Sequence, residues 1–320
     1  MAWRELGPAT LAVSQAVAAA LTESDTHLLV ACSGGADSLA LAFGALRVTT
    51  THRRRLTAVV VDHALQPGSA AVAERAKDQL CGLGFSEVIV VPVRIGVAGP
   101  GGPEAAARQA RYAALRAEAA TRQATIWLGH TMDDQAESVL LGLARGSGTR
   151  SLAGIAPRAD GLVRPLLSLR RSVTEQACIE FGLDPWRDPH NADPRFARVR
   201  VRSRVLPALE AELGPGVAEA LARTAALARD DADLLDRLAS DADPGTNTLD
   251  CAELLALPAA LRTRVIRRWL LRHGAAEVAS RHVVMVSALV TVWRGQGPID
   301  LPGVRVTRED GSLACRPQKE

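Results

Sequence analysis

The sequence predicts an α/β fold. A doubly wound, mostly parallel sheet is expected in an N-terminal domain, followed by a mainly helical region and a small α+β C-terminal domain. Strand-like and helix-like runs alternate through the first 165 residues, as in sheets whose parallel strands are joined by helices. The largely β-branched run 57–61 is typical of a strand buried on both faces. Beyond residue 168 the pattern becomes helical, and short strands separated by glycine-containing turns return at 298–316.

Each element is predicted from its own pattern. Short apolar runs predict strands at 27–32, 56–62, 86–93, 124–129 and 161–165. Longer stretches with helical spacing predict helices at 9–21, 36–47, 69–83, 103–122 and 132–144. Gly214-Pro215-Gly216 interrupts the helical region, and long Ala/Leu/Arg-rich helices continue from there to about residue 294. We therefore expect two domains, 1–212 and 213–320.

Composition narrows the class of protein. The net charge is only +3, so affinity for nucleic acid would have to come from local arginine clusters. Such clusters occur at 53–55, 195–204 and 262–272, although a solvated helix face has the same pattern. The five cysteines contain no Cys-x-x-Cys, which argues against a zinc ribbon, an iron–sulfur cluster or a disulfide framework. No stretch is apolar enough to span a bilayer, and we expect a cytoplasmic protein with no membrane partner.

The most informative segment lies between the first expected strand and the helix after it. It consists of Ser33, Gly34, Gly35, Ala36, Asp37 and Ser38. A strand, a glycine-rich turn and a helix start together surround an anion with backbone N–H groups. A carboxylate approaches phosphate only with a cation between them, so Asp37 predicts Mg²⁺. The sequence contains no Gly-x-x-x-x-Gly-Lys-Ser/Thr motif. The alternative is a glycine-rich turn that binds nothing.

Polar side chains also follow the second and fourth expected strands. His63 follows the second, where capping a helix is the alternative role, and His130 follows the fourth. Asp134 and Glu137 are three residues apart at a helix start and share one face, which directs them to the same crevice as Asp37. One acid could serve as a helix cap. Three converging carboxylates predict Mg²⁺ binding and a base for an incoming amine.

Two arginines share one face of the helix expected at 103–122. Arg108 and Arg111 are three residues apart. They could form an ordinary solvated stripe, or they could hold phosphate and the charge that develops during adenylation.

In chain order, these motifs resemble those of the tRNA(Ile)-lysidine synthetase family, whose loop is of the ATP-pyrophosphatase type. The resemblance extends from the first strand to about residue 207. It rests on the segments 33–38, 62–63, 104–112, 130–137, 145–148, 152–154 and 164–167. The tail from residue 301 is similar to the small C-terminal domain of the shorter members. Two positions depart from the family pattern: His190 stands where serine is common, and Val199 stands where asparagine is common.

The resemblance implies an adenine nucleotide alpha-hydrolase-like fold and a ligase that converts ATP to AMP and diphosphate. ATP would adenylate C2 of the wobble cytidine in isoleucine tRNA with anticodon CAU, and the ε-amine of L-lysine would displace AMP to give lysidine. Residues 1–212 would be the ATP-pyrophosphatase catalytic domain with a helical extension. Residues 213–320 would bind tRNA or substrate. The oligomeric state stays open, with a homodimer among the alternatives.

The resemblance also assigns roles by position. Catalysis falls to Asp37, Arg111, Asp134 and Glu137. ATP binding falls to Ser33, Gly34, Gly35, Ala36, Asp37, Ser38, His63 and His130. Substrate or tRNA contacts fall to Arg108, Arg145, Arg198 and Arg202, and Mg²⁺ falls to Asp37 and Asp134.

Two rival functions remain. A tRNA thiolase would use the same loop but generally needs paired cysteines near it, and in the sequence only Cys32 lies close. A binding protein would hold tRNA without chemistry, but it has no use for three acids directed at phosphate. Release of pyrophosphate from ATP separates the enzymes from the binder, and dependence on lysine separates the ligase from the thiolase.

Overall fold

The computed structural model describes residues 6–62, 68–93, 102–146, 148–188, 193–276 and 278–318. The chain forms two compact units. The first comprises Met1–Leu141 and Ile155–Ala222, and the second comprises Gly142–Gly154 and Arg223–Glu320. The units therefore divide between Ala222 and Arg223, whereas the boundary that we expected from the sequence is at residue 212.

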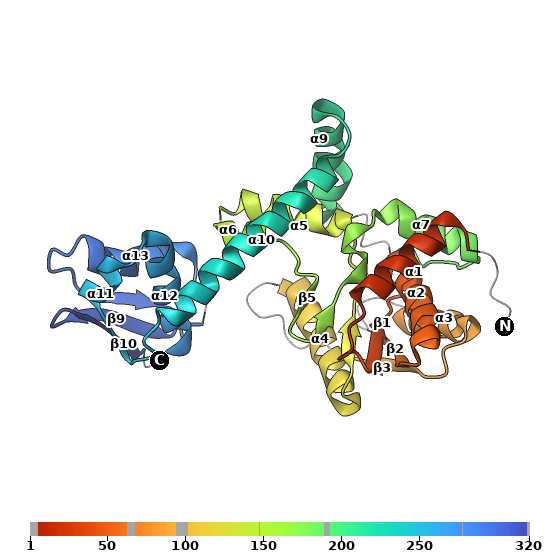
Figure 1. The fold of residues 1–320 in the computed structure, drawn as a ribbon, viewed down its shortest axis with the longest axis horizontal. Helices are drawn as coiled ribbons and strands as arrows, with labels where there is room; N and C mark the ends of the chain where they lie inside the picture. The colour runs from red at the N-terminus through yellow and green to blue at the C-terminus, as the bar shows by residue number, and fades with distance from the viewer. Residues whose placement is uncertain are drawn as a thin grey trace. The chain divides into compact units, whose positions relative to one another are not determined.

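The first unit contains a six-stranded sheet in the order β3-β2-β1-β4-β6-β5 (Figure 1). Its strands are β1 (His27–Ala31), β2 (Arg55–Asp62), β3 (Val88–Pro92), β4 (Thr125–Trp127), β5 (Arg158–Ala159) and β6 (Leu162–Val163). All neighbours pair in parallel except β5, which pairs antiparallel with β6. The predicted mostly parallel sheet is confirmed. Strand β5 was not predicted, because Arg158 and Ala159 belong to no apolar run, whereas the equally short β6 lies in the run predicted at 161–165.

Helices connect and cover these strands. Those that begin before β6 are α1 (Pro8–Ala20), α2 (Ala36–His52), α3 (Ser69–Leu83), α4 (Gly102–Arg122), α5 (Met132–Ala144) and α6 (Thr149–Leu152). After β6 come η1 (Pro165–Ser168), α7 (Arg171–Phe181), α8 (Ala197–Arg200), η3 (Val201–Val205), α9 (Leu206–Leu213) and α10 (Val217–Asp241). Helix α2 extends past its expected end at residue 47, and α6 was not predicted. Helices α1, α3, α4 and α5 agree with their expected ranges within about one residue.

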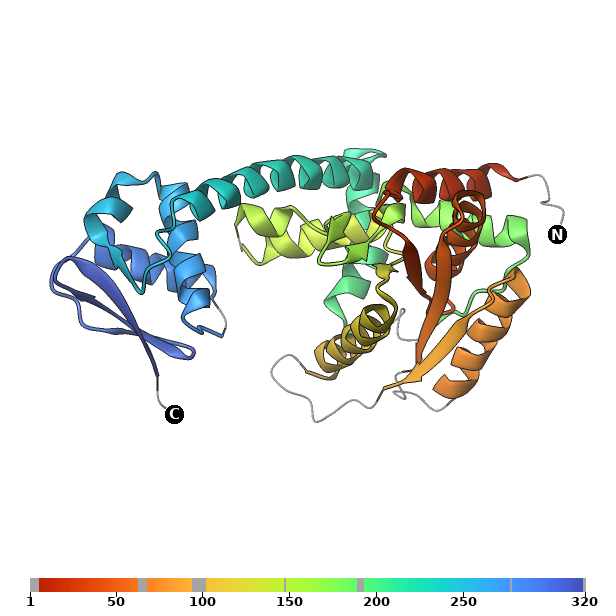
Figure 2. The ribbon, with the colours of Figure 1, turned by 60° about the horizontal axis from the view of Figure 1, so that its bottom comes forward.

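Both faces of the sheet are buried, as a doubly wound fold requires. On one face Leu28 and Val30 of β1 pack in the same core as Phe43 of α2. On the opposite face Leu29 packs with Leu115 of α4. Figure 2 shows α4 and the pair α1 and α2 on different sides of the strands. The side chains of β1 therefore alternate between two hydrophobic cores, which explains why its sequence is apolar throughout.

The second unit is a small α+β domain, as predicted. Its sheet has the order β7-β10-β9-β8 and is antiparallel throughout. Its elements are β7 (Thr248–Asp250), α11 (Cys251–Ala256), α12 (Ala259–Arg272), α13 (Ser280–Thr291), β8 (Ile299–Leu301), β9 (Val304–Glu309) and β10 (Ser312–Pro317). Trp269 is fully buried at the centre of its core. Strand β7 was not predicted, because it has only three residues and leads directly into a helix.

The order of the strands places the site. Strands β1 and β4 are neighbours, and the chain continues from them to opposite edges of the sheet. Ligands of such sheets bind beyond the carboxyl ends of the strands at this switch point. The segments with the predicted chemistry, 33–38 and 130–137, follow β1 and β4 directly. Among the described residues, no helix is long and apolar enough to cross a membrane.

Candidate active site

The glycine-rich loop joins β1 to α2 and is held from within by Ser38. Its hydroxyl accepts a hydrogen bond from the Ser33 backbone N–H at 3.1 Å and donates one to the Gly35 carbonyl at 2.9 Å. Gly34 has a φ of +78°, a conformation that favours glycine, and its carbonyl accepts a hydrogen bond from Trp186 N–H at 2.8 Å. Gly35 caps α2 without a side-chain hydrogen bond. The start of α2 therefore retains backbone N–H groups that can bind an anion.

Gly129 allows the end of β4 to approach this loop closely. A Cβ at this position would lie 2.7 Å from the Asp37 carbonyl oxygen and 3.1 Å from the Ser38 nitrogen. Both contacts are with backbone, so no side-chain rotation could relieve them. The two strand ends therefore meet at a distance that only glycine permits.

Three carboxylates converge on one guanidinium, that of Arg171. Its Nε donates to Asp37 Oδ2 at 3.2 Å, and its Nη2 donates to Asp134 Oδ1 at 3.0 Å. Its Nη1 lies 3.6 Å from Glu137 Oε1. These acids come from α2 and from the first turns of α5, so the predicted convergence of Asp37, Asp134 and Glu137 is present in the structure.

The remaining oxygens of the two aspartates have neutral partners. Asp37 Oδ1 accepts a short hydrogen bond from the Thr174 hydroxyl. Asp134 Oδ2 accepts from both the backbone N–H and the hydroxyl of Thr131, at 2.8 and 3.0 Å. Each carboxylate is thus fixed on one side by a threonine and bound on the other by Arg171.

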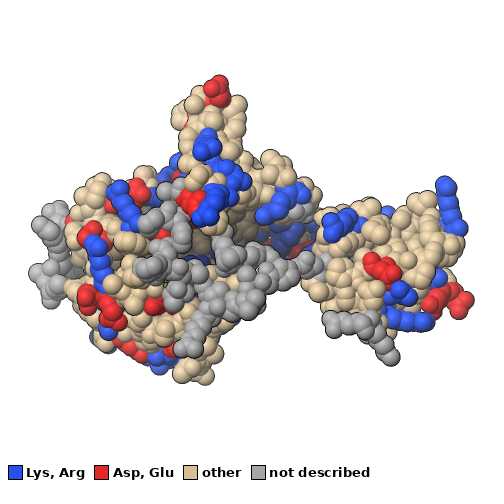
Figure 3. Space-filling view, turned by 180° about the vertical axis from the view of Figure 1, so that it is seen from behind, with Lys and Arg blue, Asp and Glu red and all other residues tan. Residues whose placement is uncertain are grey.

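Glu137 is fully buried and has two further arginine partners. Arg198 Nε donates to its Oε2 at 2.7 Å, and Arg202 Nε donates to its Oε1 at 2.6 Å. Arg198 lies on α8, and Arg202 lies on the π-helical turn η3, a local irregularity that often marks functional positions. Figure 3 shows basic side chains gathered at the base of α9, which follows this segment.

The two aspartates differ in their electrostatics. Burial raises the pKa of Asp37, and the charge of Arg171 only partly opposes this effect. Burial would also raise the pKa of Asp134, but Arg171, the Thr131 backbone N–H and Arg198 together outweigh it, and the pKa is lowered. Asp134 is therefore the more firmly ionised of the two.

A cluster of basic residues adjoins the acids. Arg108 and Arg111 of α4 lie over the Tyr112 ring at 4.9 and 5.4 Å from its centroid, and Arg164 precedes η1. Burial lowers the pKa of both Arg111 and Arg164. Burial also lowers the pKa of His130 to about 4, so its imidazole is neutral at pH 7. The charges of Asp134, Arg164, Arg198 and Arg111 all act on His130, which therefore lies between the two groups.

Three nitrogen atoms of this basic cluster are buried without a hydrogen-bond partner among the described residues: Arg111 Nε, His130 Nδ1 and Arg164 Nε. Leaving a buried donor unsatisfied costs free energy. Guanidinium groups that are not paired with an acid, together with such free donors, are what an anion-binding site requires. Arg108 is exposed, as a solvated stripe requires, but that interpretation does not account for Arg111, which is half-buried and whose Nε is fully buried.

Some predicted residues lie elsewhere. Arg145 is exposed and belongs to the second compact unit. His63 and His190 lie outside the described residues. In the 262–272 cluster, Arg264 is paired with Asp236, and Arg272 is paired with Asp243. Part of that cluster therefore neutralises acids within the second unit.

Sequence reasoning did not identify Arg171, Thr174 or Arg164 as site residues. One signal was available for Arg171. It begins α7, where the helix dipole favours acids and disfavours cations. The acid that satisfies this helix start comes from another element, because Asp133 Oδ2 accepts the Arg171 backbone N–H at 2.7 Å. An arginine at an unfavourable helix position indicates that its side chain has partners elsewhere in the fold.

The donor set fits a divalent cation of the magnesium type. Mg²⁺ is commonly bound by one or two carboxylates together with substrate phosphates. Asp37 Oδ2 and Asp134 Oδ1 both face the Arg171 guanidinium beside the loop that is suited to phosphate. Asp134 Oδ1 also lies 3.6 and 3.7 Å from the Nη2 atoms of Arg198 and Arg202. Among the described residues, no cluster of three or more His, Cys, Asp or Glu forms a metal site made by protein alone. A cation here would therefore depend on the substrate for further ligands.

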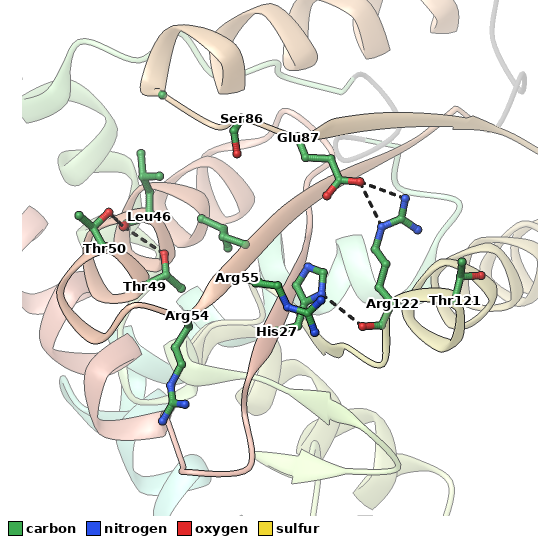
Figure 4. Close-up of a pocket in the computed structure, with 12 residues that line it drawn as sticks. His27, Leu46, Thr49, Thr50, Arg54, Arg55, Ser86, Glu87, Thr121 and Arg122 are labelled. Atoms are coloured by element: carbon green, nitrogen blue, oxygen red, sulfur yellow. Dashed lines mark hydrogen bonds and ion pairs between the residues drawn. The ribbon is translucent and has the colours of Figure 1, made fainter.

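A cavity among the described residues lies away from this site. It has a volume of about 700 Å³ and lies where β1 and β2 begin, at the amino ends of the strands, whereas the glycine-rich loop follows the carboxyl end of β1 (Figure 4). Three of its titratable groups, His27, Glu87 and Arg122, are paired within the fold, whereas Arg54 Nε is buried without a hydrogen-bond partner among the described residues. His27 Nε2 bonds Thr57 at 2.9 Å, Thr57 donates to Glu87 at 2.7 Å, and Arg122 pairs with Glu87 at 3.1 Å. We interpret this network as structural.

Comparison with known proteins agrees with this geometry. A PP-loop domain model matches residues 10–209, and a TilS substrate binding domain model matches residues 249–314. The chain is 52% identical over 299 residues to the tRNA(Ile)-lysidine synthase of Leifsonia xyli subsp. xyli, covering 91% of this chain and 90% of that protein. It is 50% identical over 316 residues to the enzyme of the same name from Thermobifida fusca, covering 96% and 97%.

A solved structure also resembles this one. The U34-tRNA thiolase NcsA from Methanococcus maripaludis aligns with a TM-score of 0.54 and 16% identity, covering 68% of this chain and 78% of that one. At that identity the match shows a shared fold alone.

Proposed function

This chain belongs to the tRNA(Ile)-lysidine synthase family, and we propose that it ligates L-lysine to the wobble cytidine of CAU-anticodon isoleucine tRNA with ATP. The observation that carries the proposal is the convergence of Asp37, Asp134 and Glu137 beside the glycine-rich loop. An ATP-dependent ligase needs a phosphate cradle, acids for a cation and a group that handles the amine proton, all in one place.

The loop would bind the triphosphate. The uncapped start of α2 and the open backbone at Gly34 and Gly35 suit phosphate oxygens. Asp37 and Asp134 would hold Mg²⁺, which would neutralise phosphate charge and orient the α-phosphate for attack. Gly129 allows the end of β4 to pack closely against the backbone of Asp37, so the Asp37 carboxylate and the glycine-rich loop are held in place together.

The basic cluster of Arg111, His130 and Arg164 would act in the first step, the adenylation of the base. Adenylation joins the C2 oxygen of cytosine to the α-phosphate of ATP and expels pyrophosphate. Negative charge builds on phosphate oxygens as this bond forms. Arg164 is buried and Arg111 is half-buried, and the Nε atoms of both are buried without a partner among the described residues. Both arginines can stabilise that charge without reorganising. Neutral His130 can donate or accept one hydrogen bond at the same place.

Glu137 would serve the second step. The ε-amine of lysine attacks C2 of the adenylated base, AMP leaves, and the attacking nitrogen must lose a proton. Glu137 is fully buried and fixed by Arg198 and Arg202. These two hydrogen bonds therefore hold the Glu137 carboxylate in a defined position, as a base that removes a proton requires. The match of 249–314 to a substrate-binding domain supports a tRNA-binding role for the second unit.

The thiolase alternative receives less support. Cys32 and Cys178 are buried, and burial raises the pKa of each thiol, to about 12 for Cys178. A thiolate nucleophile or metal ligand needs the opposite shift.

The experiment replaces Glu137 with glutamine and follows the two steps separately. Removing the carboxylate charge takes away the base, so we expect Glu137→Gln to lose lysine ligation by about 100-fold or more. Pyrophosphate release from ATP in the presence of tRNA should fall less. Glu118→Gln is the matched control, because Glu118 pairs with Arg122 at 2.6 Å within α4. If Glu137→Gln ligates lysine at the wild-type rate, the assignment of the second step is wrong.

A further inference from the structure

Arg171 has a contact pattern that a purely structural ion pair does not explain. Its guanidinium reaches one oxygen of Asp37 and one of Asp134, at 3.2 and 3.0 Å, and it also approaches Glu137. These two aspartate oxygens are the ones left free by Thr174 and Thr131. The guanidinium therefore bridges the same pair of oxygens that a divalent cation between the carboxylates would use.

We propose that Arg171 is a positioning residue that competes with the divalent cation for Asp37 and Asp134. The guanidinium bridges the carboxylates when no metal does, and it moves aside when the metal binds. This inference rests on the proposed function only for the identity of the cation. Two cations cannot share one pair of oxygens in a partly buried site without strong repulsion, so the two arrangements exclude each other.

The residues around Arg171 allow this exchange, because each acid keeps other hydrogen-bond partners. When Arg171 leaves, Asp37 keeps its bond to Thr174, and Asp134 keeps its bonds to Thr131. Glu137 keeps its bonds to two other arginines. The displacement therefore removes the closest cation from both oxygens and leaves no buried carboxylate without a partner. Arg198 and Arg202 stay at 3.6 and 3.7 Å from Asp134 Oδ1, beyond hydrogen-bond distance.

The position of Arg171 supports the same reading. It is the first residue of α7, where its charge opposes the helix dipole. Its side chain is 20% exposed, so the guanidinium can move toward solvent without unfolding the helix. Its neighbour Arg170 pairs instead with Asp133 and Glu219, at 3.2 and 3.0 Å. Arg170 thus offers a matched control on the same helix end.

The test measures the binding of Mn²⁺ alone to the full-length protein by electron paramagnetic resonance. Arg171→Gln removes the competitor, and we expect it to bind Mn²⁺ about tenfold more tightly than wild type, since two partly buried ion pairs no longer have to be broken. Arg170→Gln should bind as wild type does. Equal or weaker binding by Arg171→Gln would show that Arg171 only organises the acids and would overturn the proposal.

A second measurement is made on the wild-type protein and does not depend on the folding of Arg171→Gln. In wild-type protein labelled with ¹⁵N-arginine, the Nε–H signal of Arg171 is assigned by its absence in Arg171→Lys. Its chemical shift should move away from that of an ion-paired guanidinium when Mg²⁺ is added. A signal that is unchanged at saturating Mg²⁺ would contradict the exchange. Neither experiment contains ATP, tRNA or lysine. An enzyme that fails to ligate lysine but shows both effects would refute the proposed function and leave this inference intact.

Discussion

Replacing Gly129 with alanine should damage both stability and nucleotide binding. The added methyl would lie 2.7 Å from the carbonyl oxygen and 2.9 Å from the carbonyl carbon of Asp37. Ordinary contacts of this kind are about 3.5 Å or longer, so the two segments must separate by roughly half an ångström or more. Overpacking of a rigid site costs about 1–3 kcal/mol. Because the displaced backbone is the start of α2, the phosphate cradle moves with it.

The assay compares Gly129→Ala with Gly82→Ala, a substitution in α3 of the same unit. An alanine Cβ at Gly82 would meet nothing within 4 Å, and alanine stabilises a helix by up to about 1 kcal/mol over glycine. We expect urea denaturation to show a lower midpoint for Gly129→Ala and an equal or higher one for Gly82→Ala. The Kd for ATP, measured by calorimetry, should rise about tenfold or more in Gly129→Ala alone. An unchanged midpoint and Kd in Gly129→Ala would refute this reasoning.

Two further predictions concern stability. Burial would raise the pKa of Asp25, but hydrogen bonds from Arg158 and Thr22 lower it from 3.8 to about 2. The ionised Asp25 therefore contributes about 2 kcal/mol to the free energy of unfolding above pH 4, and this contribution is lost as the pH falls through 2. Asp25→Asn should be less stable than wild type at pH 7, and the difference in stability should narrow in acid denaturation. Asp250 caps α11 through two backbone N–H groups at 2.7 and 2.9 Å, so Asp250→Ala should lose about 1 kcal/mol in urea unfolding, and no loss would contradict the cap.

The sheet was predictable because each of its main strands has a local signal. Strands β1 and β2 are apolar on both faces, and this pattern identifies buried parallel strands without any long-range information. The helices α3 and α5 begin and end where the sequence predicted. Strands β4 and β6 are just as short, but they lie in apolar runs that predicted them. Strands β5 and β7 were not predictable, because they lie in no such run and only their pairing with β6 and β10 defines them.

The site was predictable where residues follow a strand and not where the tertiary fold supplies a partner. Asp37 and Asp134 were found because they lie just beyond β1 and β4. Arg171 comes from a helix more than thirty residues later in the chain, and only the packing of α7 beside α2 brings it to the acids. The same limit applies to Arg272, whose pairing with Asp243 is absent from any local pattern.

The most direct test of the central claim is the incorporation of labelled L-lysine into unmodified CAU-anticodon isoleucine tRNA, with ATP and Mg²⁺ and a control without ATP. The account predicts labelling that requires both ATP and lysine and that releases one AMP for each lysine transferred. Cleavage of ATP with tRNA but without lysine uptake would contradict it. That result would leave activation of the base in place and would require a nucleophile other than an amine.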